Sequence, residues 1–188
     1  MLPQSFFDKP ALDLAKSLLG CTLVHKTKEG ITSGVIVETE CYHQDDEASH
    51  TFRGPTARNK VMFGPGGHAY IYFTYGMHYC FNVVAGQDGK GEGVLIRALE
   101  PLEGMEIMKK RRGKDNIHQL CSGPAKLVQA MGISKADYGT PLFAGNLHIK
   151  SPDKAKAIQV ATGPRIGIKQ AVDKPWRFWV KGNPFVSK

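Results

Sequence analysis

Two carboxylates, Glu38 and Glu40, stand two residues apart at the end of an apolar run, and Tyr42 follows at the same spacing. Residues two apart in an extended strand share a side, so both carboxylates would face the same way. Partial burial raises the pKa of such a group, whereas a nearby cation such as Arg97 lowers it. A carboxylate tuned in this way can take a proton from water as a general base. The alternative is that Glu38 and Glu40 are ordinary surface residues of a strand.

Aromatic side chains further along the chain could hold a flat ring. Tyr42, His50 and Tyr72 are the candidates, and Tyr75 stands in a turn between two β-rich runs. Rotating a base out of a DNA duplex costs a few kcal/mol, and an aromatic contact returns about 1–3 kcal/mol per base. A side chain at a hairpin tip can also fill the position that the base leaves. The alternatives are core packing for the tyrosines and an ordinary hydrogen-bonded loop position for His50.

These residues are candidates for each requirement of one reaction, the hydrolysis of a purine N-glycosidic bond. That reaction needs a base for the water, negative charge beside an oxocarbenium-like sugar, and a site for the purine. No lysine is marked by its neighbours as a Schiff-base nucleophile, so hydrolysis without strand scission is the simpler hypothesis. The segment Gly64–Gly67 lacks the Lys-Ser/Thr of a phosphate-binding loop, which argues against a nucleotide-driven enzyme.

The elements that position these residues predict a mixed α/β (α+β) fold. We expect a single domain that spans residues 1–188, built around a curved, largely antiparallel sheet with a protruding β-hairpin. The polar, Gly- and Pro-rich stretch from His43 to Gly67 is predicted to be irregular and functional. Helices are predicted from Pro10 to Gly20, Pro101 to Arg112 and Pro124 to Met131. Strands are predicted at Cys21–Thr27, Ile31–Thr39, His68–Thr74, His78–Ala85, Gly91–Leu99, Asn146–Ile149, Ala157–Val160 and Trp176–Val180.

Composition narrows the class of partner. The 188 residues carry a formal net charge of +8, which favours a polyanion such as nucleic acid. The basic block Lys109–Lys114 is either a phosphate contact or a solvated helix end. No apolar run approaches the roughly 18 residues of a membrane span, and the N-terminus lacks a secretion signal, so we expect a cytoplasmic protein that uses no membrane. The four cysteines include no Cys-x-x-Cys pair, which favours reduced thiols.

A metal site is the main alternative for the histidines. Cys41, His43 and His50 could be read as a metal cluster, and a metal-dependent hydrolase could use His43, His50, His68 and His78. Most such groupings in proteins are incidental, and the hydrolysis considered above needs no metal, so we expect no metal and no cofactor.

Several ordered blocks of the sequence resemble the alkyladenine (3-methyladenine) DNA glycosylases. They run through most of the chain, from Phe6-Phe7 to Trp176–Val180. The most specific are VETECY at 37–42, HTFRGPTARN at 50–59, MF at 62–63, YIYFTYGM at 70–77, Asn82, LIRALEP at 95–101 and CSGPAKL at 121–127. The loop between Glu40 and His50 is one residue shorter than in vertebrate relatives, and no long N-terminal extension precedes the first block, which indicates a bacterial protein.

The resemblance implies roles for the residues considered above. Glu40 would deprotonate the attacking water, and Arg97 would help to hold that water beside the sugar. The base pocket would be lined by Tyr42, His50 and Tyr72. Asn82 would crowd the exocyclic amine of normal guanine, which gives selectivity by exclusion.

It also implies a set of DNA contacts. Tyr75 matches the residue that enters the minor groove in place of the flipped nucleotide, with Met77 beside it. The implied partner of a monomeric protein is double-stranded DNA containing damaged purines, among them 3-methyladenine, 7-methylguanine, hypoxanthine and ethenoadenine. A non-catalytic damaged-DNA binding module is the alternative. Contacts to the DNA backbone would come from Arg53, Arg58, Ser122, Gly123 and Lys126.

Overall fold

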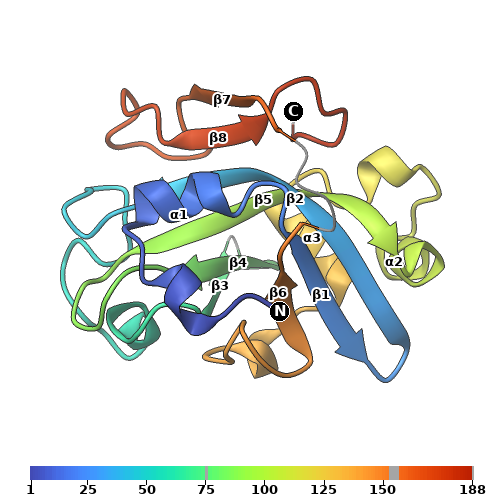
Figure 1. Cartoon of the computed structure of the whole chain (residues 1–188), viewed down its shortest axis with the longest axis horizontal. Coiled ribbons are helices and arrows are strands. Elements are labelled where there is room, and N and C mark those ends of the chain that lie inside the picture. The colour runs from blue at the N-terminus through green and yellow to red at the C-terminus, as the bar shows by residue number, and fades with distance from the viewer. Residues whose placement is uncertain (75, 153–156, 188) are drawn as a thin grey trace.

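A curled antiparallel sheet forms the centre of the molecule and gives it the mixed α/β architecture expected from the sequence (Figure 1). The computed structural model describes residues 1–74, 76–152 and 157–187. The main path of the sheet has the order β3-β4-β5-β2-β1-β6, and β8 pairs with both β2 and β7. The strands are β1 (Thr22–Thr27), β2 (Gly30–Tyr42), β3 (Ala69–Thr74), β4 (His78–Val84), β5 (Gly93–Glu103), β6 (Leu147–Lys150), β7 (Val160–Gly163) and β8 (Arg177–Val180).

Strand β2 is longer than the alternation predicted, and it changes one neighbour along its length. Its first half pairs with β1, and its second half pairs with β8 on the side that β1 has left, while β5 stays on the other side. Residues 36–41 are therefore buried without interruption. The hydroxyl of Thr39 donates to the carbonyl of Ala15 in the helix that covers this part of the strand. Both carboxylates that the sequence singled out lie in this buried half.

Three α-helices pack on the sheet: α1 (Ala11–Ser17), α2 (Met105–Arg112) and α3 (Pro124–Met131). In Figure 1, α1 crosses in front of the long central strands. Helix α3 has the predicted bounds, begins with a proline and buries Leu127 and Met131. Short 3-10 turns lie at Gln4–Phe7 (η1), Lys60–Phe63 (η2), Ile117–Gln119 (η3) and Lys135–Asp137 (η4).

The prediction of a helix beginning at Pro101 was wrong, because β5 continues to Glu103. Pro101 lies opposite Gly34 beside a register shift, a position where a missing backbone N–H is tolerated. The helix starts only after Gly104, which adopts φ +74°, and a Cβ there would come within 2.2 Å of the carbonyl oxygen of Ile31. Glycine thus sets the end of the strand and the start of α2.

The strand predicted at Ala157–Val160 lies further along the chain in the structure and shares only Val160 with the prediction. Strand β7 begins at Val160, where it pairs with Val180, and runs to Gly163. Just before it, the backbone N–H of Lys181 donates to the carbonyl of Gln159 at 2.8 Å. The position of β7 is determined by β8, a partner that local hydrophobicity does not reveal.

Strands β3 and β4 form the predicted hairpin, with Thr74 opposite His78. Tyr75, the expected tip residue, lies outside the described residues. On either side of it, Phe73 is 48% exposed and Met77 is 69% exposed. No helix among the described residues has the length and apolar character needed to cross a membrane.

Candidate active site

A cavity of about 680 Å³ opens where β2, β3, β4 and β5 meet the loop that follows β7. The sequence predicted several of the side chains around it, which come from segments far apart in the chain. Its wall includes Tyr42, His50, Tyr70, Tyr72, Asn82, Arg97, Ile166 and Lys169.

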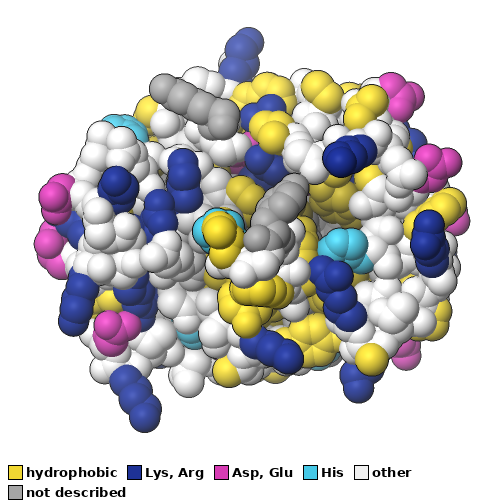
Figure 2. Space-filling view, turned by 180° about the vertical axis from the view of Figure 1, so that it is seen from behind, with side chains coloured by type: hydrophobic (Ala, Val, Ile, Leu, Met, Phe, Trp, Pro, Cys, Tyr) yellow, Lys and Arg dark blue, Asp and Glu magenta, His cyan; other side chains and the backbone are white. Residues whose placement is uncertain are grey.

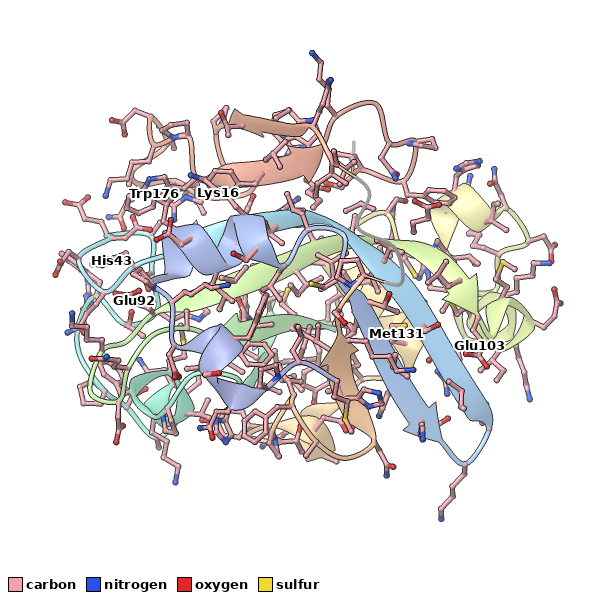
Figure 3. The ribbon with its side chains drawn as sticks, in the orientation of Figure 1. Lys16, His43, Glu92, Glu103, Met131 and Trp176 are labelled. Atoms are coloured by element: carbon pink, nitrogen blue, oxygen red, sulfur yellow. The ribbon has the colours of Figure 1, made fainter. Side chains whose placement is uncertain are left out.

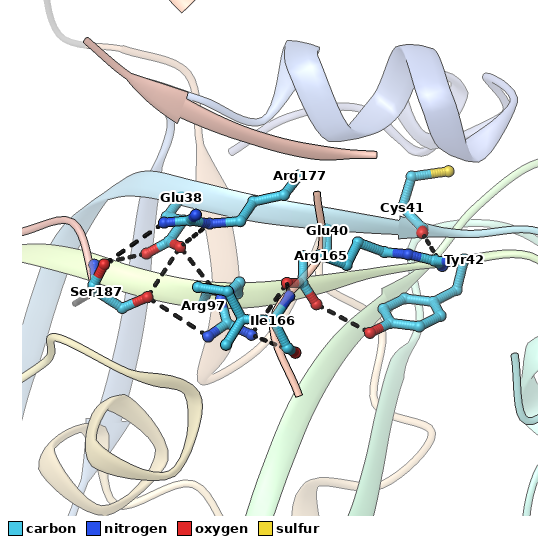
Figure 4. Close-up of polar contacts among 9 residues, drawn as sticks. All are labelled: Glu38, Glu40, Cys41, Tyr42, Arg97, Arg165, Ile166, Arg177 and Ser187. Carbon is cyan, nitrogen blue, oxygen red and sulfur yellow. Dashed lines mark hydrogen bonds and ion pairs between the residues drawn. The ribbon is translucent and has the colours of Figure 1, made fainter. Parts of the chain in front are cut away.

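Glu40 is fully buried directly behind this wall. Its Oε2 accepts a hydrogen bond of 2.9 Å from the hydroxyl of Tyr42, and its Oε1 accepts one of 2.7 Å from the backbone N–H of Ile166. Nη1 of Arg97 lies 3.1 Å from the same Oε1. All three partners line the cavity, so they connect the carboxylate to it (Figure 4).

Burial raises the pKa of Glu40 above its ordinary value. Arg97, the Ile166 N–H and the Tyr42 hydroxyl act in the opposite direction, and the nearby charge of Glu38 adds to the increase. The net effect is an increase in the pKa, so the carboxylate accepts a proton more readily than that of an exposed glutamate.

Arg97 contacts both carboxylates of β2. A register shift leaves it unpaired in β5, between Ala98 opposite Glu38 and Ile96 opposite Thr39. Bulges of this kind re-aim a side chain. Its Nε donates to Oε1 of Glu38 at 3.2 Å, while Nη1 faces Glu40. The shared cation puts both glutamates on one side of β2, as the alternation predicted, and their full burial excludes the reading of both as surface residues.

Glu38 has further partners that sequence reasoning missed. It accepts hydrogen bonds from Nε of Arg177 at 2.6 Å, from the backbone N–H of Ser187 at 2.7 Å and from the Ser187 hydroxyl at 2.9 Å. Arg177 is the single charge in the aromatic strand Trp176–Val180, a signal that could have marked it. Nothing in the local sequence marks Ser187.

A second buried ion pair fixes the loop that carries Ile166. Arg165 and Asp46 pair with both side chains fully buried, and Nη1 of Arg165 also donates to the carbonyl of Cys41 at 3.0 Å. The Arg165 guanidinium lies over the ring of Tyr42, 4.7 Å from its centroid. The pair thus ties the irregular segment after β2 to the loop after β7, and sequence reasoning found neither partner.

The aromatic wall is held together by contacts among its rings. Nδ1 of His50 lies 2.9 Å from the hydroxyl of Tyr70, and the His50 and Tyr72 rings meet edge to face at 4.5 Å. Burial, together with the charge of Arg58, lowers the pKa of His50. Burial raises the pKa of Tyr42 and Tyr72 and brings that of Tyr70 to about 12. These four aromatic side chains are therefore uncharged at neutral pH.

Asn82 lines the cavity, and the residues predicted to contact the DNA backbone lie in segments next to it. The buried Asn82 donates from Nδ2 to the carbonyl of Tyr70 at 3.2 Å. The exposed Arg58 lies 5.4 Å from the Tyr72 ring centroid. Arg53 and Arg58 line an adjoining cavity of about 490 Å³ that shares His50 and Tyr70 with the first. Ser122, Gly123 and Lys126 lie at the start of α3, next to the cavity residue Pro124.

The histidines considered for a metal site have separate partners. Nε2 of His43 lies 2.9 Å from Oε1 of the buried Glu92, and Figure 3 shows the two side by side. His68 contacts the carbonyl of Pro65 through Nδ1, and His78 is exposed. Within residues 1–74, 76–152 and 157–187, no group of three or more His, Cys, Asp or Glu side chains could hold a metal ion. The cysteines are free and buried.

Comparison with known proteins decides the family. The model of the methylpurine-DNA glycosylase (MPG) family matches residues 5–184. The chain belongs to this family. The match covers every residue named in the cavity wall and stops before Phe185 and Ser187.

Individual proteins that are similar to this chain along its whole length lead to the same family. Proteins named "Putative 3-methyladenine DNA glycosylase" are 51% identical in Agrobacterium fabrum, 48% in Methanoculleus marisnigri and 49% in Carboxydothermus hydrogenoformans. Each match covers 100% of this chain and, respectively, 92%, 98% and 99% of the relative. As a member of the methylpurine-DNA glycosylase family, the protein is a DNA glycosylase, and DNA is its substrate.

Proposed function

We propose that this member of the methylpurine-DNA glycosylase family removes damaged purines from duplex DNA by hydrolysis, with a water molecule activated by Glu40, and leaves an abasic site. The observation that carries the proposal is the fully buried carboxylate of Glu40, hydrogen-bonded to cavity residues and facing Arg97 at 3.1 Å. A carboxylate in that position combines the two functions that the reaction needs, a proton acceptor and a negative charge beside the sugar.

In the proposed mechanism, ionised Glu40 accepts a proton from the water as the water attacks C1′ of the sugar. The electron pair of the N-glycosidic bond leaves with the purine, and the hydroxyl group stays on the sugar. Arg97 keeps Glu40 ionised and helps to hold the water. A general base of this kind contributes a rate factor of about 10²–10⁴, or roughly 3–5 kcal/mol of the barrier.

The damaged base would be flipped into the aromatic cavity and held by Tyr42, His50 and Tyr72. This placement is supported by the aromatic side chains themselves, which are uncharged at neutral pH and already packed against each other. Tyr75, with the exposed Met77 beside it, would fill the vacated position in the duplex.

Selectivity for damage would have two sources. The bases 3-methyladenine and 7-methylguanine carry a positive charge, which weakens their glycosidic bonds, whereas hypoxanthine and ethenoadenine are neutral and depend more on the pocket. The buried amide of Asn82 would exclude the exocyclic amine of undamaged guanine. Undamaged guanine would thus be rejected by shape as well as by its stronger bond.

The surface charge fits a DNA duplex. Figure 2 shows a face on which apolar side chains gather in the middle, with Lys and Arg side chains around them and most Asp and Glu side chains toward the edge. We assign backbone contacts on the protein's DNA-binding surface to Arg53, Arg58, Ser122, Gly123 and Lys126, and a monomer suffices for them.

The experiment uses duplexes that carry one 7-methylguanine, hypoxanthine or ethenoadenine. Hydrolysis predicts free base in solution and a strand that stays intact until alkali cleaves it at the abasic site, with full activity in excess EDTA. Binding without base release would instead establish the non-catalytic alternative. Because Lys169 lines the cavity, borohydride trapping is included. A covalent protein–DNA adduct would overturn the monofunctional mechanism, since only an amine nucleophile forms one.

A further inference from the structure

The carboxylate of Glu38 is more heavily tethered than that of Glu40, although it takes no part in the proposed chemistry. It is fully buried and accepts hydrogen bonds from Arg97, from Arg177 and from both the backbone N–H and the hydroxyl of Ser187 (Figure 4). Buried charges are tolerated when they are paired and hydrogen-bonded in this way. A site with so many donors fixes the carboxylate in one orientation.

We propose that Glu38, clamped by Arg177 and by the C-terminal Ser187, is a positioning residue that orients the guanidinium of Arg97 toward Glu40. The inference rests on the function proposed above and extends the active site to Ser187. Arg177 acts through Glu38, Ser187 acts through Glu38 and through its own contact with Arg97, and Glu38 acts through Arg97.

The geometry around Arg97 supports this role. Arg97 is the unpaired residue of a bulge, so the regular strand ladder does not determine its direction. A guanidinium is a planar fork, and holding Nε against Glu38 at 3.2 Å determines where Nη1 and Nη2 point. Nη1 then faces Glu40 at 3.1 Å, and Nη2 lies 3.5 Å from the Ser187 hydroxyl.

The charges around Glu38 lead to the same conclusion. Arg97 alone would have to neutralise two buried carboxylates, Glu38 and Glu40. Arg177, with Nε 2.6 Å from Glu38, supplies the second positive charge. Arg97 can therefore pair with Glu40 without leaving Glu38 as an uncompensated buried charge.

The C-terminal segment is anchored at the same place by apolar contacts. Phe185 is 9% exposed and packs with Val37 and Ala98, the residues next to Glu38 and Arg97 in their strands. Nδ2 of Asn183 donates to Glu100 at 2.7 Å. These anchors hold the segment so that Ser187 reaches Glu38.

The test is a double-mutant cycle on single-turnover release of 7-methylguanine from duplex DNA, with the variants Glu38→Gln, Arg97→Lys and the double variant. Misplacing a catalytic group by about 1 Å can cost a factor of ~10², so we expect Glu38→Gln to slow release by about 10- to 100-fold. The dissociation constant for the lesion duplex should change by less than about threefold, because the effect lies in the transition state. In the Arg97→Lys background, Glu38→Gln should slow release by less than about threefold.

The control for charge removal is Glu92→Gln, which also neutralises a buried carboxylate but has contacts to His43 and the Ala11 N–H instead of Arg97. It should retain the parent release rate. Equal losses for Glu38→Gln in both Arg97 backgrounds, or no loss at all, would overturn the positioning role. If Glu38→Gln does not fold, Arg177→Gln replaces it: release should slow, and Arg177→Lys should recover most of the rate. Absence of recovery would overturn the proposal.

The Glu40→Gln variant in the same assay separates this inference from the proposed function. Its full activity would refute the role of Glu40 whatever the behaviour of Glu38. Its inactivity together with a fully active Glu38→Gln would leave Glu40 as the base and refute only the positioning role.

Discussion

The hydroxyl of Tyr42 donates a hydrogen bond of 2.9 Å to Oε2 of Glu40, two residues earlier in β2. This bond lowers the pKa of the Glu40 carboxyl, so Tyr42→Phe should raise it. Because the proposed base must be ionised, the rate of 7-methylguanine release should decrease as the pH is lowered. In Tyr42→Phe this decrease should begin at a higher pH than in the parent protein. The measurement is the single-turnover rate as a function of pH.

The control for Tyr42→Phe is Tyr138→Phe, which removes a hydroxyl bonded to the carbonyl of Arg58 and has no contact with Glu40. Its release rate should begin to decrease at the same pH as that of the parent protein. A decrease in Tyr42→Phe that begins at the parent pH or at a lower pH would contradict the assigned contact.

His50 should be neutral at pH 7, because burial and the charge of Arg58 lower its pKa below the ordinary 6.5. Removing that charge in Arg58→Ala should raise the pKa of His50, and Lys60→Ala, a loss of exposed charge on the same segment, should move it less. NMR titration of the imidazole resonances measures both. A pKa of His50 above 6.5 in the parent protein would refute the assignment of a neutral His50 in the cavity wall.

Asp46→Asn should destabilise the fold, because Arg165 would remain as a buried charge without its partner. Breaking a buried ion pair in this way costs about 3–5 kcal/mol. Asp45→Asn is the matched control, since that side chain is 90% exposed, and it should change the free energy of unfolding by no more than about 0.5 kcal/mol. Urea unfolding at neutral pH compares them, and equal stability of the two variants would exclude the anchoring role.

Asn82→Ala should speed the release of undamaged guanine and of 7-methylguanine relative to hypoxanthine, because both guanines carry the exocyclic amine that the buried amide would no longer crowd. Hypoxanthine has no exocyclic amine and serves as the matched substrate, whose release should not change. Mass spectrometry of the free bases measures all three. A proportional change for guanine and hypoxanthine would mean that Asn82 does not discriminate by exclusion.

Local sequence pattern was enough to find the residues of one strand or one hairpin. Alternation placed Glu38 and Glu40 on one side at the end of a strand, and β-rich runs on both sides of a turn predicted the hairpin of β3 and β4. Both features depend on spacings of a few residues, which side-chain periodicity reports directly. The bounds of α3 followed from its leading proline and apolar stripe for the same reason.

The contacts that hold the site were not predictable, because their partners are far apart in the chain. Arg165 and Asp46 are 119 residues apart, and Ser187 and Glu38 are 149 apart. These pairs form only because β8 replaces β1 beside the second half of β2 and the C-terminal segment then packs over the bulge. A bulge such as the one at Arg97 also has no periodic signature. The sequence could therefore mark Arg97 as a candidate but could not predict the direction of its side chain.

The role of Glu40 as the base is tested most directly by Glu40→Gln on a duplex with one 7-methylguanine, under single-turnover conditions at saturating protein. The variant should bind the duplex as the parent protein does and release the base about 10²–10⁴-fold more slowly, the factor expected for a general base. Base release at the parent rate by Glu40→Gln would contradict water activation by Glu40.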